Sequence, residues 1–413
     1  MHYGIITPPV AGHIHPFGAL GRELIARGHR VTLLHMEDVR ARAIEEGLEF
    51  AARGESDHPP GSLLRSLAEL GQRKGLGALR FTIEAVRRTT EMICRDAPAV
   101  LEMRGIDRLL VDQMEPAGGS VAEHLGIPFV TICNALALNR EPCMPPPFTG
   151  WNYTRSAWGR ARNSAGYAIH DRLMSPVMQV VAKWRKRWGL AVLRGTDESF
   201  STLAQISQMT RGFDFPRERL PQCFTYAGPL RRPDLNPVSF PWHKLDGRPV
   251  IYASLGTLQH GKREIFARMA EACAPLDVQM VIAHNGGLSD TDIAALAGKP
   301  VAVPFAPQRD VLKRAALTLT HAGLNTVLDS LAAAVPIIAM PITYEQPAIG
   351  ARLDASRTGL SITSARLTAV NIREGILRIL RDASYRDRAR RAAEEICQAG
   401  GVGRATSVIE GTG

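Results

Sequence analysis

The sequence has few of the features that mark membrane, secreted or metal-binding proteins. Its apolar runs all stay short of the roughly 18 residues that a membrane-spanning helix needs. The first residues, MHYGIITPPVAGH, include neither the basic segment nor the long apolar segment of a signal peptide. The six cysteines lie far apart and form no C-x-x-C pair, so neither a disulfide framework nor a zinc site is indicated. These absences predict a cytoplasmic protein with reduced thiols.

Motifs of nucleic-acid binding and of dinucleotide binding are also missing. The net charge is +10, but the arginines are dispersed and no helix-turn-helix, RNA-recognition or zinc-finger pattern appears. A general attraction to anions, or to an anionic membrane face, explains the charge equally well. No G-x-G-x-x-G follows the first expected strand, which argues against a dehydrogenase. We therefore expect no nucleic-acid partner, while peripheral contact with the inner face of the membrane stays open.

What the sequence does contain is a repeated alternation of apolar strands and periodic helices. With 413 residues, 45% of them apolar, the chain is long enough for two ordinary domains. The alternation predicts an α/β fold in which parallel sheets carry helices on both faces. In the N-terminal half the expected strands are 2–9, 29–36, 107–113 and 127–134, and the expected helices are 15–28, segments around 60–103, and 116–126.

Residues 140–200 interrupt this alternation and are expected to form an inserted region of loops and helix. EPCMPPPFTGW (141–151) is a proline-rich loop, and 175–192 has the pattern of a basic amphipathic helix that carries Trp184 and Trp188. Two interpretations of this helix stay open. It packs on the domain and exposes a solvated basic face, or it covers a substrate cleft or rests on a membrane.

A second alternating run follows the proline cluster at 226–242. Its expected strands are 248–256, 278–284, 299–305, 316–322, 335–341 and 359–363. We therefore predict two facing Rossmann-like domains, 1–225 and 243–413, joined by the 226–242 linker. The last helices, about 368–382 and 384–399, either stay with the second domain or pack back on the first. Ligands of such sheets bind at the carboxyl ends of the strands, so the cleft between the domains is the expected site.

Two of the expected strand ends carry turns that suit a diphosphate. THAGLNT (320–326) opens a helix, whose free N–H groups and dipole favour an anion, and its glycine permits close approach of the backbone. The second turn, SLGT (254–257), is small and carries hydroxyl groups. Two such turns converging on one cleft fit a diphosphate, whereas each alone is a common helix start. The residues concerned are Ser254, Gly256, Thr257, His321, Gly323, Asn325 and Thr326.

The segment FAPQRDVL…THAGLNTVLDSLAAAVPIIAMPITYEQPAIGARL (305–353) resembles the donor-binding signature of the family 1, UDP-sugar-dependent glycosyltransferases, which have the GT-B fold of two facing Rossmann-like domains. The resemblance extends to GHIHP (12–16), to the SLGT turn and to the two-domain length. The stretch 111–148 looks most like the bacterial branch that includes zeaxanthin (carotenoid) glucosyltransferases. The resemblance implies an enzyme that transfers a hexose, with glucose expected, from a UDP-sugar to a hydroxyl group.

The resemblance implies roles at the nucleoside end of the donor. Phe305 stands in place of a tryptophan that stacks on uracil, and Ala306 would contact the base through its backbone. Gln308 matches a residue near the nucleoside, and Asp329 takes the place of a glutamate that binds the ribose hydroxyls. The departure at Phe305 leaves the choice between uracil and thymine open, so a dTDP-sugar is the alternative donor.

At the other end of the donor, Glu345 and Gln346 take the place of an Asp-Gln pair that holds the sugar hydroxyls. The glutamate, one methylene longer than the family's aspartate, leaves the choice of hexose open. The resemblance assigns the diphosphate to Thr257, His321, Gly323, Asn325 and Thr326.

Glycosyl transfer needs a base for the acceptor hydroxyl and stabilisation of the departing diphosphate. A histidine with a pKa near ~6.5 is neutral and basic at physiological pH, and a carboxylate on its other nitrogen fixes the tautomer. His13 and Asp112 follow expected strands, and the family has its base and helper acid at these two points. A single in-line displacement would invert the anomeric centre. No H-E-x-x-H pattern or cysteine cluster argues for a metal, and no cofactor is expected.

The 111–148 resemblance and the proline-rich loop favour a lipophilic alcohol as the acceptor, such as a hydroxylated carotenoid. A terpenoid, a polyketide or a pterin stays open. Two other functions are weighed against transfer. A nucleotide-sugar 2-epimerase would use carboxylates in place of His13, and a non-enzymatic nucleotide-sugar binder needs no base. The presence of His13 and Asp112 beside the donor signature argues against both.

Overall fold

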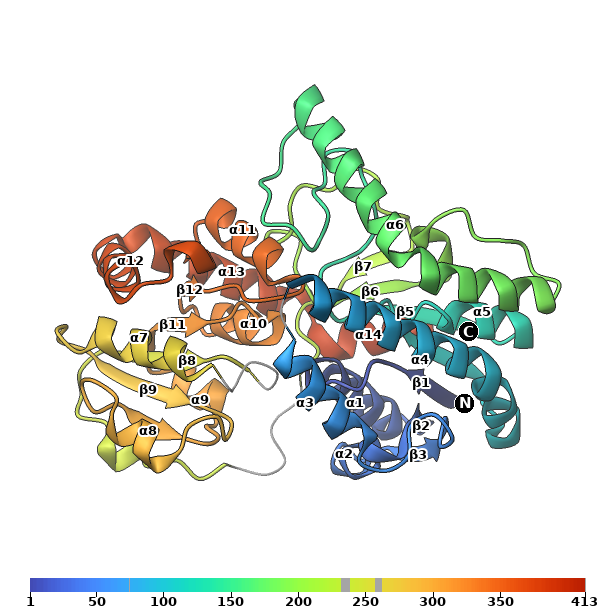
Figure 1. The fold of residues 1–413 in the computed structure, drawn as a ribbon, viewed down its shortest axis with the longest axis horizontal. Coiled ribbons are helices and arrows are strands. Elements are labelled where there is room, and N and C mark those ends of the chain that lie inside the picture. The colour runs from blue at the N-terminus through green and yellow to red at the C-terminus, as the bar shows by residue number, and fades with distance from the viewer. Residues whose placement is uncertain (74, 232–237, 257–261, 413) are drawn as a thin grey trace.

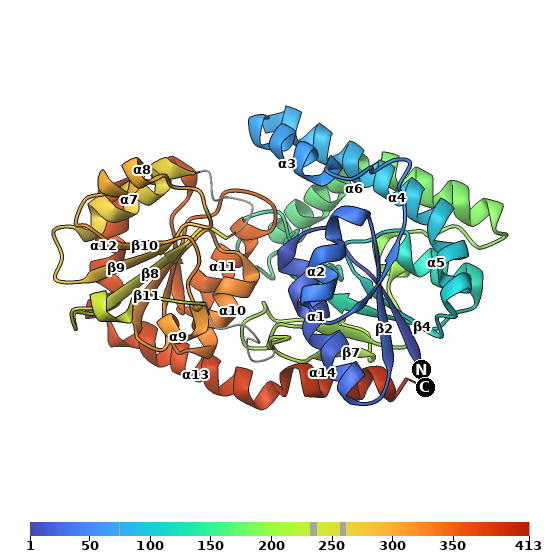
Figure 2. The same cartoon turned by 90° about the horizontal axis from the view of Figure 1, so that it is seen from below.

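The computed structural model describes residues 1–73, 75–231, 238–256 and 262–412, and Figures 1 and 2 show them as two lobes side by side. Each lobe is built on a parallel sheet whose strands are short and largely buried. Strands covered on both faces have near-continuous apolar sequences, as in HYGII and VIYAS. The predicted α/β fold with two Rossmann-like sheets is therefore confirmed.

The first sheet has seven strands in the order β3-β2-β1-β4-β5-β6-β7. The second has six, in the order β10-β9-β8-β11-β12-β13. The strand order reverses between β1 and β4 in the first sheet and between β8 and β11 in the second, which makes these pairs the expected ligand-binding points. The strands are β1 His2–Ile6, β2 Arg30–His35, β3 Glu49–Ala52, β4 Arg108–Asp112, β5 Phe129–Cys133, β6 Gln205–Ser207, β7 Phe224–Tyr226, β8 Val250–Ser254, β9 Gln279–Ala283, β10 Val301–Val303, β11 Ala315–Thr320, β12 Ile337–Ala339 and β13 Gly359–Ser361.

Helices cover both faces of each sheet. In the first lobe, α4, α5 and α6 pack on one face, while α1 and α14 pack on the other. The helices are α1 Ala11–Ala26, α2 Arg40–Glu45, α3 Ser62–Gln72, α4 Gly75–Arg104, α5 Gly118–Leu125, α6 Ala157–Arg187, α7 Arg263–Cys273, α8 Asp290–Ala294, α9 Gln308–Leu312, α10 Leu324–Ala332, α11 Gln346–Ser356, α12 Ala369–Arg381, α13 Ala383–Ala399 and α14 Gly401–Glu410. Among the described residues, no helix is both long and apolar enough to cross a bilayer.

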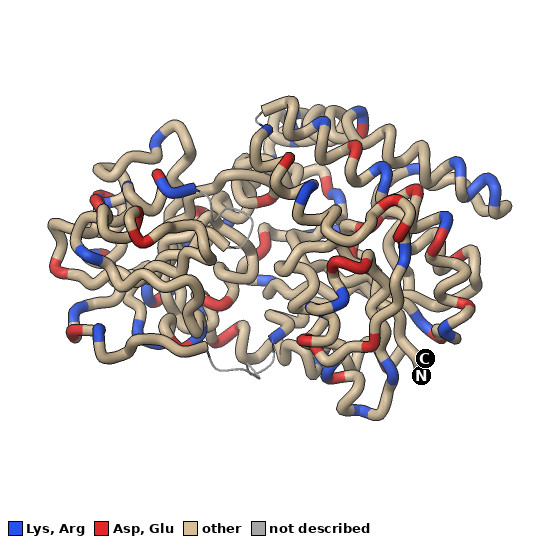
Figure 3. The backbone as a smooth tube through the Cα atoms, turned by 60° about the horizontal axis from the view of Figure 1, so that its bottom comes forward, with Lys and Arg blue, Asp and Glu red and all other residues tan. Residues whose placement is uncertain are grey.

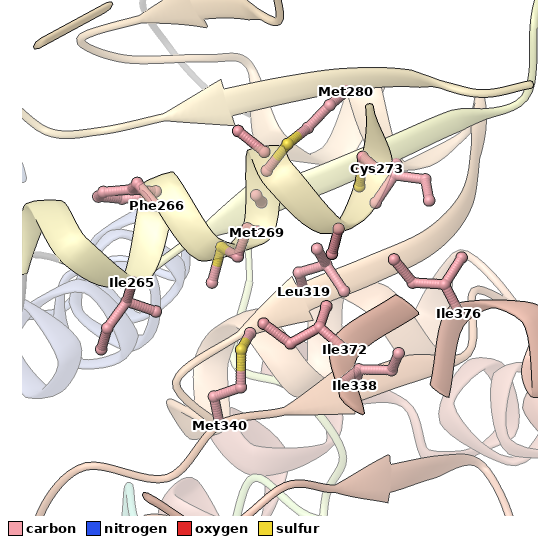
Figure 4. Close-up of a cluster of buried hydrophobic side chains, with 14 of the residues drawn as sticks. Ile265, Phe266, Met269, Cys273, Met280, Leu319, Ile338, Met340, Ile372 and Ile376 are labelled. Carbon is pink, nitrogen blue, oxygen red and sulfur yellow. The ribbon is translucent and has the colours of Figure 1, made fainter. Parts of the chain in front are cut away.

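The core of the second lobe shows how the sequence pattern becomes packing. Ile265, Phe266 and Met269 recur at helical spacing along α7 and point toward the sheet. Figure 4 shows them facing Ile372 and Ile376, one turn apart on α12, with strand residues between. Full burial of each such side chain contributes about 1.5–3 kcal/mol of transfer free energy. This cluster fixes β8, which ends at Ser254, and β11, which comes directly before His321.

The two lobes are joined by a shared core and by the C-terminal helices. Phe213 of the first lobe packs with Leu324 and Ile349 of the second in one buried cluster. Figure 2 shows α13 and α14 running from the second lobe to the first, where the two chain ends lie next to each other. There Arg108 of β4 donates a hydrogen bond to the Ile409 carbonyl at 2.9 Å.

The helix expected at 175–192 is longer and placed differently. It is α6, which begins at Ala157 and continues through Pro176. The proline cannot donate to the Arg172 carbonyl one turn earlier, and the Ser175 hydroxyl donates to that carbonyl instead, at 2.9 Å. Trp184 is 8% exposed and Trp188 stacks on His124 with 4.4 Å between ring centroids. The two tryptophans therefore pack on the first lobe.

Candidate active site

His13 lies in the first turn of α1, directly after β1, and its Nδ1 is 2.7 Å from Asp112 Oδ2 at the end of β4. The carboxyl ends of adjacent parallel strands meet at one edge of the sheet, which is why two residues 99 positions apart meet there. The Asp112 side chain is fully buried. It also accepts hydrogen bonds from Asn134 Nδ2 at 3.0 Å and from the Met114 amide at 2.9 Å. A carboxylate held in this way fixes the imidazole and leaves Nε2 as the nitrogen for an acceptor hydroxyl.

The charges around His13 act on its basicity. Burial alone would lower the pKa of His13, but the Asp112 carboxylate outweighs burial and, with Glu345 and Glu115, raises it above the ordinary value. Glu345 belongs to the second lobe, so a carboxylate of that lobe acts electrostatically on His13. Burial also raises the pKa of Glu115 to about 7. His13 is therefore a stronger base than a free histidine.

His15 has a different environment from His13. Its side chain is 59% exposed, and its Nδ1 lies 2.5 Å from Glu46 Oε1. Glu46 also pairs with Arg22 of the same helix. His15 is therefore part of a surface ion cluster on α1, away from the Asp112 carboxylate.

Across the cleft, His321 follows β11 and is nearly buried. Burial lowers its pKa to about 4, so the imidazole is neutral at physiological pH. The ring lies against two glycines: a Cβ on Gly323 would come within 2.5 Å of His321 Nε2, and one on Gly256 within 2.8 Å of Cε1. Gly256 also has a φ of 66°, which favours glycine. The two turns predicted to converge therefore do so around the His321 ring.

The α10 helix begins at Leu324 with Gly323 as its N-cap, a residue without a side chain that could cap the helix. The first N–H groups of a helix lack partners within it and attract anions. Thr326 is buried in this first turn, and Ser254 is buried at the end of β8, where its hydroxyl accepts from the Gly256 amide at 3.3 Å. Thr257 lies outside the described residues. The described residues that were predicted to bind the diphosphate thus lie around the N-terminus of α10.

Gln308 and Asp329, both expected at the nucleoside, are bonded to each other. Gln308 Nε2 donates to Asp329 Oδ2 at 2.6 Å, and the Tyr252 hydroxyl donates to Gln308 Oε1 at 3.1 Å. Phe305, the expected stacking residue, is 60% exposed, and Ala306 beside it is half-buried. A base placed on the Phe305 ring would therefore lie next to an ordered polar pair.

The two residues expected to bind the sugar, Glu345 and Gln346, have different surroundings. Gln346 is buried, and its Oε1 accepts from the Ile342 and Thr343 amides at 2.8 and 2.9 Å. These bonds shape the loop between β12 and α11. Glu345 is half-buried, and the charge of its carboxylate contributes to raising the pKa of His13.

The amino-acid sequence matches known proteins over most of its length. The family model "UDP-glucoronosyl and UDP-glucosyl transferase" matches residues 196–394. The chain is 37% identical to a zeaxanthin glucosyltransferase of Pantoea ananas, covering 99% of this chain and 95% of that protein. It is also 37% identical to one of Pseudescherichia vulneris, over 99% and 97% of the two chains. The chain belongs to the UDP-glucosyl transferase family.

The fold of this glycosyltransferase agrees with that assignment. The crystal structure of the glycotransferase of kitacinnamycin superimposes with a TM-score of 0.77 at 20% identity, covering 100% of this chain and 98% of that one. Identity at this level supports the GT-B fold alone. The predicted family membership and the predicted enzyme class are confirmed.

Arg231 and Asn134 bond candidate site residues, although the sequence pattern did not single them out. Arg231 follows β7 and donates from Nε to Asp329 Oδ1 at 3.0 Å and from Nη2 to Asn325 Oδ1 at 2.8 Å. Asn134 comes directly after β5 and donates to Asp112. The signal for Asn134 was present, because it is a polar residue at a strand end. Arg231 lies in a proline-rich stretch without periodicity, where nothing in the sequence distinguishes it from its neighbour Arg232.

Proposed function

We propose that this glycosyltransferase transfers glucose from UDP-glucose to a hydroxyl group of a hydroxylated carotenoid, with inversion at the anomeric carbon and His13 as the general base. The observation that carries the proposal is the 2.7 Å contact between His13 and a fully buried Asp112, facing a helix N-terminus of the other lobe. The chain is 37% identical to two zeaxanthin glucosyltransferases over nearly its full length, which supports a carotenoid as the acceptor.

In the proposed reaction, His13 Nε2 removes the proton of the acceptor hydroxyl. The acceptor oxygen then forms a bond to C1 of the glucose, and the bond between C1 and the diphosphate oxygen breaks. The electron pair of that bond leaves with UDP, so an α-linked donor gives a β-linked product. Asp112 stabilises the imidazolium that forms.

The departing diphosphate is held, in this proposal, by the N–H groups at the start of α10. His321 is neutral because its pKa is lowered by burial, so it acts as a hydrogen-bond donor rather than as a cation. No metal is required in this scheme. Preincubation with EDTA is expected to leave the initial rate unchanged, and a rate that falls and returns with Mg²⁺ would contradict this part of the proposal.

The test follows UDP release and glucoside formation with purified protein, UDP-glucose and detergent-solubilised zeaxanthin. His13→Ala should lower the rate by a factor on the order of 10²–10⁴ while calorimetry shows unchanged UDP-glucose binding. His15→Ala is the matched control, because His15 is mostly exposed and bonds Glu46; it should act as wild type.

The same assay separates the alternatives. Turnover of dTDP-glucose in preference to UDP-glucose would correct the donor, and turnover of a terpenoid, polyketide or pterin alcohol instead of zeaxanthin would correct the acceptor. UDP release without any acceptor, insensitive to His13→Ala, would favour a 2-epimerase. Binding of UDP-glucose without turnover of any alcohol would overturn the transferase mechanism.

A further inference from the structure

The first half of α6 projects from the first lobe. Figure 1 shows this part of the helix, residues 157–173, extending beyond the rest of the molecule. Its inner side packs on the proline-rich loop: Asn163 Nδ2 donates to the Pro142 carbonyl at 3.1 Å, and Gly166 lies against Pro146 and Trp151. The opposite side of the helix faces away from the lobe.

That outer side has an apolar stripe. Trp158 is 71% exposed, Ile169 61% and Leu173 40%. At 3.6 residues per turn these three side chains lie on one face of the helix. Exposed alanines fill the stripe between them, at positions 161, 165 and 168. We call this surface the α6 stripe. A large exposed apolar face on a helix marks a site of association.

The charge beside the α6 stripe has one sign. Helical spacing places Arg162 and Arg172 on the same face as the stripe, and no carboxylate of the described residues forms an ion pair with either of them. The only acidic residue between 157 and 173 is Asp171, which accepts two hydrogen bonds from Arg140, at 2.8 and 2.5 Å. Arg162 also lies over the Trp158 ring, 5.5 Å from its centroid. Along the chain as a whole, Figure 3 shows basic and acidic residues interspersed.

We propose that the α6 stripe docks on an anionic lipid bilayer, an inference that rests on the proposed lipophilic acceptor. Tryptophan prefers the interface between headgroups and acyl chains, and arginines on the same helix reach the lipid phosphates. An amphipathic helix of this kind lies in the plane of the interface. The positive charge beside the stripe favours anionic headgroups over a protein surface that carries both signs of charge.

The α6 stripe is connected to the donor half of the cleft by one loop. The proline-rich loop that supports α6 reaches Gly150, where a Cβ would lie 3.4 Å from Pro347 Cβ. Pro347 directly follows Gln346, at the proposed sugar end of the donor. A carotenoid diol dissolves in the bilayer rather than in water, so docking through α6 would bring the lipid phase next to this side of the cleft.

The experiment is vesicle flotation of the purified full chain. Vesicles of phosphatidylcholine and phosphatidylglycerol in equal parts should carry wild-type protein upward, and vesicles of phosphatidylcholine alone should carry far less. Trp158→Ser with Ile169→Ser should lower the bound fraction at least tenfold. Arg172→Gln should lower the affinity about fivefold. Met103→Ser, at an apolar residue that is 81% exposed on α4, is the matched control and should bind as wild type.

Activity separates this inference from the proposed function. The Trp158/Ile169 variant should turn over detergent-solubilised zeaxanthin as wild type does and lose most turnover of zeaxanthin embedded in vesicles. His13→Ala should show the reverse pattern, with normal flotation and no turnover. Equal flotation on both vesicle types, or a Met103→Ser loss as large as that of the stripe variant, would overturn the inference. If the chain forms a dimer that requires Trp158 and does not bind vesicles, the stripe contacts a second copy of the chain instead.

Discussion

Asn325 Nδ2 of α10 donates a hydrogen bond to the Gly12 carbonyl of α1 at 2.8 Å. The contact joins the two lobes one residue before His13, at the helix start proposed to hold the diphosphate. Asn325 Oδ1 accepts from Gln208 Nε2 at 3.1 Å and from Arg231. A direct hydrogen bond between the lobes thus contributes to the position of the proposed base relative to the proposed diphosphate site.

Asn325→Ala is expected to lower kcat/KM by about tenfold, because it removes this bond and leaves two donors without their acceptor. The loss should appear in steady-state kinetics with both substrates varied. Asn371→Ala is the control, since Asn371 is half-buried on α12 and its side chain donates only to the Arg366 carbonyl among the contacts described. A kcat/KM for Asn325→Ala equal to that of Asn371→Ala would show that the contact between the lobes does not position the site.

Asp112→Asn is expected to lower kcat by a factor on the order of 10²–10⁴, because an amide can present an N–H to Nδ1 and stabilise the wrong tautomer. It should also move the acid limb of the pH profile. In the wild type the pKa of His13 is raised, so activity falls as pH drops through a value above the ordinary ~6.5. Without the carboxylate, burial still lowers the pKa of His13, so the acid limb of the pH profile moves to lower pH. A limb that stays in place would show that another group titrates.

Arg231→Ala is expected to raise the donor KM by about tenfold with a smaller change in kcat. The guanidinium bonds both Asp329 and Asn325, so its loss leaves a carboxylate without its cation close to the incoming diphosphate. Titration calorimetry with UDP would measure the effect on donor binding alone. Arg248→Ala, which breaks an exposed pair with Asp246 away from the cleft, should bind UDP as wild type. Unchanged UDP affinity in Arg231→Ala would limit Arg231 to a structural role.

The sequence predicted the parts of this molecule that depend on local pattern. Buried strands have apolar sequences, and His13 and Asp112 could be paired because both lie at expected strand ends, where the resembling family has its base and helper acid. Short strands were missed where the pattern is too brief, as at Gln205–Ser207 and Phe224–Tyr226. These strands pair only with residues far along the chain.

Contacts between distant segments could not be predicted. The bonds of Arg231 to Asp329 and Asn325 join the end of one lobe to a helix about a hundred residues later. The expected helix began at 175, whereas α6 begins at Ala157 and continues through Pro176, where the Ser175 hydroxyl bonds the Arg172 carbonyl. The exposed stripe of α6 could not be predicted from the sequence either. Nothing in the sequence shows that Trp158 stays exposed while Trp184 is buried.

Asp214 and Arg352 form a buried ion pair across the lobes, with Arg352 Nη2 2.8 Å from Asp214 Oδ1. Burial alone would raise the pKa of Asp214, but Arg352 and Arg217 outweigh it and lower the pKa from 3.8 to about 2. A lowered pKa contributes stability that is present above about pH 4 and lost as pH falls toward 2. Asp214→Asn leaves two buried guanidinium groups without their carboxylate, so it should lower the free energy of unfolding by about 3–5 kcal/mol at neutral pH.

Urea unfolding from pH 7 down to 2 should show the stabilities of wild type and Asp214→Asn converging in the acid window, while Asp246→Asn, at an exposed pair, follows the wild type throughout. A difference that stays constant across that window would mean that packing, and not the ion pair, accounts for the loss.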